Sequence, residues 1–241
     1  MIWMICTKGD PHGLVDAKST FASLALLFAG SLAGPHYLAA EPTWKAGVAR
    51  VDITPYGSIW MAGYGARTEP SKGVRQPLYA KALAIEDQTG SVSVIVTADL
   101  IGFRKEPAEK IAERAAAEHK LARDKLILNG SHTHSGPMTR VTKAYSLRLS
   151  HRQIEIIQRY QDRLVDLVVD VIGQALAGRQ PVTLEYEQGL AGFAVNRRRV
   201  QRREYPSPTD HDVPVLAVRS ADGSLLAAAF GYACHATVLN D

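Results

Sequence analysis

Residues 91–137, SVSVIVTADLIGFRKEPAEKIAERAAAEHKLARDKLILNGSHTHSGP, contain the pattern that decides the fold. Two short runs rich in Val, Ile and Leu flank a segment rich in Ala and Glu. This segment starts near Pro107, a residue that is favoured in the first turn of a helix. A strand, a helix and a second strand within about forty residues are typical of a parallel β-α-β unit. We therefore expect an α/β fold in which Asp99 and His132 lie at the carboxyl ends of neighbouring strands, the edge where ligands bind in open α/β sheets.

The flanking sequence extends this unit in both directions. Alternating side chains predict strands at 48–52 and 78–87, with a loop rich in Gly and Pro at 59–77 between them. Apolar residues at three- and four-residue spacing predict a long helix over about 152–177, and a strand follows at 181–189. The run 213–235 predicts a hairpin that turns at Asp222-Gly223. Together these elements predict a layered mixed β-sheet with flanking helices.

Composition and charge exclude few functions. The chain has 241 residues, of which 46% are hydrophobic and 22% charged, as in ordinary globular proteins. Its net charge of +4 does not by itself indicate a nucleic-acid partner. Much of the basic excess lies in NRRRVQRR, residues 196–203, which we interpret as a solvated loop or as a segment attracted to an anionic membrane surface. Nucleic-acid binding is disfavoured because no known nucleic-acid module accompanies the run.

The first forty residues are typical of an export signal. Lys18 precedes the apolar run FASLALLFAGSLAG, which is too short to span a bilayer, and small residues at Ala39 and Ala40 suit cleavage after residue 40. The alternative is a buried N-terminal helix. We expect residues 1–40 to be signal peptide and leader, and the mature protein to be periplasmic or secreted without a transmembrane segment. The two cysteines, Cys6 and Cys234, do not form a disulfide framework, and we expect Cys234 to be a buried, unpaired thiol.

Three histidines follow predicted strands. His132 and His134 are one residue apart, so in an extended strand both side chains would point to the same face. His235 ends the second strand of the predicted hairpin. Surface or core histidines explain many single His-x-His pairs, but the Ser-Gly-Pro that follows and the second histidine-bearing strand favour a metal site. Three imidazoles with one open position are typical of catalytic zinc, which lowers the pKa of a bound water to about 7.

Seven segments occur together in a familiar order: VARVDITP, MAGYG, PLYAKALAI, VTADLIG, SHTHSGP, VNR and YACHATVL. From about Trp44 to the last residue, the chain resembles the N-terminal catalytic domain of the neutral/alkaline non-lysosomal ceramidase family, with a wider pattern closer to bacterial relatives. The chain is therefore expected to have two parts: the leader at 1–40, and at 44–241 the N-terminal part of a ceramidase-like domain, which the resemblance implies. The resemblance also implies a Zn²⁺-dependent amidase that cleaves the N-acyl bond of ceramide, so the expected partner is a lipid amide at a membrane surface.

The resemblance assigns roles to individual residues. His132 and His235 match zinc ligands, and His134 matches a histidine that lines the site and contacts substrate or bound water. Arg197 matches the arginine of the family's Asn-Arg pair, where a guanidinium can stabilise the oxyanion formed from an amide carbonyl. Asp99 matches an acidic position at a strand end and is expected to hydrogen-bond to the metal ligands without binding the metal itself.

Two departures from the family pattern affect the functional expectation. Asn-Arg is followed in the family by Ser-Pro, whereas RRVQRR follows here. The glutamate and tyrosine that complete the family's zinc site, and a catalytic serine, come later than residue 241. We therefore expect this chain to be a fragment that is inactive alone.

Two alternatives to a ceramidase remain, and a third is set aside. A related hydrolase of another N-acyl amide or ester, and a non-catalytic secreted binding protein on the same fold, stay open. The barrel amidohydrolases are set aside because their His-x-His pair lies near the N-terminus, on the first barrel strand.

Overall fold

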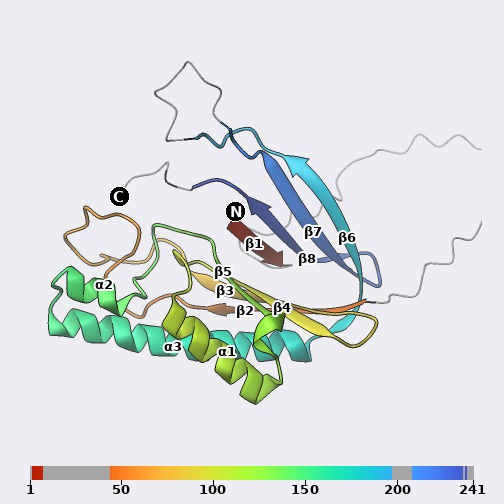
Figure 1. Ribbon diagram of the computed structural model, residues 1–241, viewed down its shortest axis with the longest axis horizontal. Coiled ribbons are helices and arrows are strands. Elements are labelled where there is room, and N and C mark those ends of the chain that lie inside the picture. Colours follow the sequence, from red (N-terminus) through yellow and green to blue (C-terminus); the bar gives the residue numbers. More distant parts are fainter. Residues whose placement is uncertain (1, 8–43, 197–207, 236, 238–241) are drawn as a thin grey trace, which may run out of the picture.

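The structure, a computed structural model, describes residues 2–7, 44–196, 208–235 and 237 (Figure 1). The strands are β1 (Ile2–Thr7), β2 (Trp44–Asp52), β3 (Tyr79–Glu86), β4 (Val92–Ala98), β5 (Leu126–Gly130), β6 (Gln180–Leu190), β7 (Asp212–Ser220) and β8 (Leu225–Tyr232). The helices are α1 (Lys105–His119), α2 (Val141–Ser146) and α3 (His151–Ala177), with a short 3₁₀ turn, η1, at Arg123–Lys125. Within these residues the strands form an eight-stranded sheet in the order β1-β8-β7-β6-β2-β3-β4-β5.

The predicted α/β class with a mixed sheet and flanking helices is confirmed. β4 and β5 are parallel and are joined through α1, as the β-α-β pattern predicts. The other described strand pairs are antiparallel, including the predicted hairpin of β7 and β8. The sequence analysis missed the short helix α2, whose six residues give too few turns for a periodic pattern.

The sheet has a hydrophobic core on each face. Because side chains alternate along a strand, Val94 and Val96 of β4 face the helices, whereas Ile95 between them faces the opposite side. Figure 1 shows α1, α2 and α3 together on one side of β2–β5. The helix-side core includes Ile111 of α1 and Ile157 of α3, both with no exposed surface. This core holds the β4-α1-β5 unit, and so the strand ends that precede Asp99 and His132, in place.

The long helix α3 lies directly on β2. Its start is a capping box, in which Ser150 and Gln153 each bond the other's backbone. At its last turn, a Cβ atom on Gly47 of β2 would lie only 2.1 Å from the carbonyl oxygen of Ala175. Glycine at position 47 therefore allows a contact between helix and strand that any larger residue would prevent.

The second half of the sheet curls over the face that the helices leave open. Figure 1 shows β6, β7 and β8 rising away from the helix side, with β1 between β8 and β3–β5. β1 pairs with β8 and also contacts β3, β4 and β5, and its Ile5 is 1% exposed. The curl therefore brings the carboxyl end of β8 toward the carboxyl end of β5, although the two strands are far apart in the sheet order.

Residues 2–7 were expected to belong to the leader, and in the structure they form a strand that covers the edge of β8. The apolar run and the predicted cleavage after Ala40 lie outside the described residues. No helix in the described part of the chain is both long and apolar enough to cross a membrane.

Candidate metal centre

The three predicted histidines meet in one cluster. His132 and His134 follow β5, which ends at Gly130, and His235 lies three residues after the end of β8. Nε2 of His134 and Nε2 of His235 are 2.9 Å apart, although the two residues are separated by 101 positions in the chain. The ring centroid of His132 lies 5.3 Å from that of His134 and 4.9 Å from that of His235. Among the described residues, these three offer ligand nitrogens that all lie within 4.8 Å of one another.

His132 adopts a backbone conformation that strand alternation does not explain. Its φ is +54°, in the left-handed region that non-glycine residues rarely occupy. β5 has already ended two residues earlier, so His132 and His134 are placed by a turn rather than by an extended strand. The prediction that strand alternation brings the His132 and His134 rings to the same face was therefore wrong, because a turn places them instead. A left-handed residue costs about 1–3 kcal/mol and tends to occur at functional sites.

A backbone carbonyl orients the His132 ring. Nδ1 of His132 lies 2.8 Å from the carbonyl oxygen of Ile101, which can only accept a hydrogen bond. Nδ1 of the neutral imidazole therefore donates, and Nε2 keeps its lone pair for a metal ion. A ligating histidine whose other nitrogen donates to a carbonyl is the usual arrangement in protein metal sites.

The loop that contains MAGYG supports His134 from the side. Gly63 has a φ of +108°, and a Cβ atom there would lie 2.5 Å from Cγ of His134. The Tyr64 ring meets the His134 ring edge-on, with centroids 4.9 Å apart. Nη2 of Arg67 donates to the carbonyl oxygen of His134 at 2.8 Å, and its Nη1 donates to the carbonyl of Ala62. Gly63, Tyr64 and Arg67 thus position the histidine without being ligands.

These supporting residues were missed from the sequence. MAGYG was used only as one of the segments that carry the family resemblance, and the Gly- and Pro-rich loop that contains it was given no chemical role. The signal that could have found them is the glycine-aromatic-glycine pattern within a long loop, because loops on a rigid scaffold often carry functional residues.

Asp99 lies where the sequence predicted, directly after β4, but its contacts are with β3. Its Oδ2 accepts a hydrogen bond from the backbone N–H of Tyr79 at 2.9 Å, and its own N–H donates to the Tyr79 carbonyl. In the part of the chain that the structure describes, Ile101 rather than Asp99 contacts the His132 ring.

Two other predicted features lie near the C-terminal strands. Arg197 lies outside the described residues, and its neighbour Asn196 donates from Nδ2 to the Pro208 carbonyl at 3.1 Å. Cys234, next to His235, is half-buried and forms no disulfide, and it does not belong to the histidine cluster.

The donor set fits a transition metal ion. Two imidazole nitrogens bound to one tetrahedral zinc ion, each at 2.0–2.1 Å from it, are about 3.3 Å apart. The ligand nitrogens of the three histidines all lie within 4.8 Å of one another, so small rotations of the rings would allow His132 and His235 to face one ion. Imidazole suits zinc, copper, iron and nickel, whereas magnesium and calcium prefer oxygen ligands.

The chain is similar to known proteins over most of its length. Residues 44–241 match the family model described as neutral/alkaline non-lysosomal ceramidase, N-terminal. The neutral ceramidase of Drosophila melanogaster is 27% identical over 243 residues, which cover 93% of this chain and 33% of that protein. Neutral ceramidase A of Dictyostelium discoideum is 23% identical, covering 85% of this chain and 30% of the relative.

A solved structure shares the fold. The crystal structure of neutral ceramidase from Pseudomonas aeruginosa matches with a TM-score of 0.64 and 26% identity, over 77% of this chain and 31% of that one. The chain thus spans about a third of the length of the relatives that it matches. Because the family model covers most of its residues, the chain belongs to the neutral/alkaline non-lysosomal ceramidase family.

Proposed function

We propose that this chain provides part of the active site of a zinc-dependent hydrolase that cleaves the N-acyl amide bond of ceramide or a related lipid amide. Membership of the ceramidase family supports this reaction class. The observation that carries the proposal is the meeting of three imidazoles from two distant segments, with Nε2 of His134 and His235 2.9 Å apart.

In this proposal, His132 and His235 hold the zinc ion and His134 lines the site beside it. When bound, zinc supplies a Lewis acid for the carbonyl oxygen and a water that is acidic enough to attack near neutral pH. The hydrogen bond from His132 to the Ile101 carbonyl keeps Nε2 of His132 directed to the ion. Arg197 is proposed to stabilise the oxyanion that develops on the amide carbonyl.

We further propose that the metal site of this chain is incomplete by itself. Two histidine ligands bind zinc less tightly than the usual shell of three or four protein ligands. The chain should therefore bind zinc weakly and give no turnover of ceramide alone. An export signal, a periplasmic or secreted location and association with a membrane surface are parts of the same proposal, consistent with a lipid substrate.

The metal assignment is tested by zinc titration against a chromogenic chelator, with metal analysis of the dialysed protein. His132→Ala and His235→Ala should each weaken zinc binding at least about tenfold. His134→Ala should weaken it less if His134 lines the site rather than binding the ion. His151→Ala is the matched control, because its side chain is 87% exposed on α3. Equal zinc affinity in all four variants would contradict the metal centre.

The reaction is tested with the product of the complete open reading frame that contains this sequence. Zinc-dependent release of a fluorescent fatty acid from labelled ceramide, lost in His132→Ala, is the expected result. Faster cleavage of a labelled N-acyl amino acid or acyl ester would indicate a related hydrolase rather than a ceramidase. Binding of zinc without cleavage of any of these three substrates would favour a non-catalytic binding protein.

A further inference from the structure

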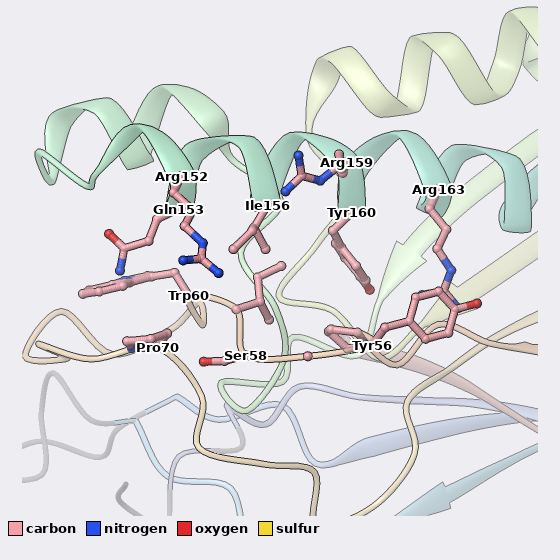
Figure 2. A pocket seen from close by; sticks show the side chains of 13 residues that line it. Tyr56, Ser58, Trp60, Pro70, Arg152, Gln153, Ile156, Arg159, Tyr160 and Arg163 are labelled. Carbon is pink, nitrogen blue, oxygen red and sulfur yellow. The ribbon is translucent and has the colours of Figure 1, made fainter.

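A cavity lies between α3 and the loop that follows β2. Its volume is about 680 Å³, and one wall is α3 while the other is the segment from Pro55 to Trp60. Figure 2 shows Arg152, Ile156 and Tyr160 of α3 pointing down toward this segment, whereas the side chain of Arg159 runs alongside the helix. None of the three clustered histidines lines the cavity, so it is separate from the metal centre. We call it the α3 groove.

Three arginines of α3 face the groove. Arg152, Arg159 and Arg163 are seven and four residues apart, a spacing that puts them on one face of the helix. Among the residues that the structure describes, no Asp or Glu lines the groove. The groove is therefore cationic, which favours an anionic occupant.

The arginines differ in how they are engaged. Nη1 of Arg163 donates to the Thr54 carbonyl at 2.9 Å, and its guanidinium lies 3.9 Å from the centroid of the Tyr56 ring, so it forms a fixed part of the wall. Arg159 lies 3.6 Å from Glu155 in a solvent-exposed pair, which contributes little. In the described part of the chain, no carboxylate lies within ion-pair distance of Arg152, whose guanidinium points toward the Trp60 side of the groove in Figure 2.

Apart from Ser58 and Gln153, the rest of the lining is mainly apolar or aromatic. Ile59 and Trp60 on the loop face Ile156 on α3, and Tyr56 at the other end is 91% exposed. The hydroxyl of Tyr160 is turned away, because it donates to the buried carbonyl of Ile53 at 2.8 Å. Tyr160 therefore adds the face of its ring rather than a polar group. Aromatic and aliphatic side chains that line a hollow together with a few charged groups are typical of a binding site.

We propose that the α3 groove is a binding site for an amphiphilic anion, with a carboxylate or phosphate head at Arg152 and Arg159 and an aliphatic chain along Trp60, Ile156 and Tyr56. Guanidinium groups bind both kinds of head through paired hydrogen bonds. A cavity of 680 Å³ is within the range that encloses small ligands. Fatty carboxylates and the phosphates of anionic lipids share this chemistry. The site does not depend on the metal centre or on the proposed amidase activity.

Calorimetry and Trp fluorescence of the 241-residue chain test the proposal, because Trp60 lines the groove. The probes are dodecanoate, dodecyl phosphate, uncharged dodecyl maltoside and inorganic phosphate. The three amphiphiles are used below their critical micelle concentrations, so that they are monomeric. Saturable one-to-one binding of either anionic amphiphile, at least about tenfold tighter than the maltoside and the inorganic phosphate, is expected. Preference for dodecanoate would identify a fatty-acid site, and preference for dodecyl phosphate a lipid-phosphate site.

Substitutions test whether the anionic amphiphiles bind in the α3 groove. Arg152→Gln combined with Arg159→Gln should weaken binding at least about tenfold, and Tyr56→Ala should weaken it without affecting folding, because Tyr56 is almost fully exposed. The control with the same loss of charge is Lys105→Gln combined with Lys110→Gln on α1, outside the groove, which should bind as the parent chain does.

Three results would overturn the proposal: no saturable binding, equal binding of dodecyl maltoside, or equal weakening in the lysine control. Binding to phosphatidylglycerol vesicles without binding of the monomeric amphiphiles would also overturn it, and would indicate a membrane-facing surface instead.

Discussion

Replacing Gly63 by alanine should damage the metal centre through His134. The φ of +108° at Gly63 is unfavourable for any residue with a side chain and costs about 1–3 kcal/mol. In addition, the new Cβ atom would lie 2.5 Å from Cγ, 2.6 Å from Cβ and 2.7 Å from Cα of His134. Optimal contacts between carbon atoms are about 3.5–4.0 Å, so the two segments must separate by about 1 Å.

The separation cannot be absorbed by rotating the His134 ring, because its backbone Cα is among the atoms that collide. The strain and the overpacking together predict a loss of about 2–4 kcal/mol in the free energy of unfolding. Because His134 is proposed to line the site rather than to bind the ion, displacing it should also lower zinc affinity, but by no more than His134→Ala does.

Urea denaturation followed by circular dichroism measures the stability, and chelator competition measures the zinc affinity. Gly65→Ala, in the same loop, is the control: its φ is not positive and no atom lies within 4 Å of the added Cβ, so both quantities should change little. If Gly63→Ala matches Gly65→Ala in stability and zinc affinity, the loop does not position His134 and the reasoning is refuted.

Three further substitutions test the surroundings of the site. Tyr160→Phe leaves the buried Ile53 carbonyl without its donor and should cost about 1–2 kcal/mol in urea denaturation. Burial raises the pKa of the Tyr160 hydroxyl above its ordinary value near 10. Above that pH the unfolded chain loses this proton before the native one does, so stability should fall as pH rises, and the slope should be shallower in the phenylalanine variant. Asp99→Ala removes the acceptor for the Tyr79 N–H and should lower the unfolding free energy by about 1–3 kcal/mol while leaving zinc affinity within about twofold. A tenfold loss of zinc affinity would instead assign Asp99 to the metal centre. Ser150→Ala removes the N-cap of α3 and should lower the thermal midpoint, at a cost of about 1 kcal/mol; an unchanged midpoint would show that packing alone fixes the start of the helix.

The sequence predicted the elements that depend on local pattern. The β4-α1-β5 unit, the long α3 and the β7-β8 hairpin agree with the periodicity of their apolar residues. This agreement is expected, because side chains repeat every two residues in a strand and every 3.6 in a helix regardless of the rest of the fold. For the same reason, histidines placed directly after apolar runs could be recognised as candidates for a strand-end site.

The contacts that position the histidines could not be predicted from the periodicity of the sequence. The left-handed turn at His132 depends on the end of β5, and the contact of Gly63 with His134 joins positions that are 71 residues apart. Asp99 was correctly placed at a strand end, but the partner of its carboxylate is decided by which strand lies beside β4. Such contacts are non-local and leave no periodic signal in the chain.

By itself, the sequence determined most of the strands and helices, though not β1 or α2, and that three histidines follow strand ends. Only the tertiary structure decided that these ends meet, because the curling of the sheet over its open face brings β8 back toward β5. The physical reason is that backbone propensities act within a few residues, whereas strand order and curvature follow from burying both faces of one sheet. The α3 groove likewise exists only where the arginine face of one helix meets a loop a hundred residues earlier in the chain.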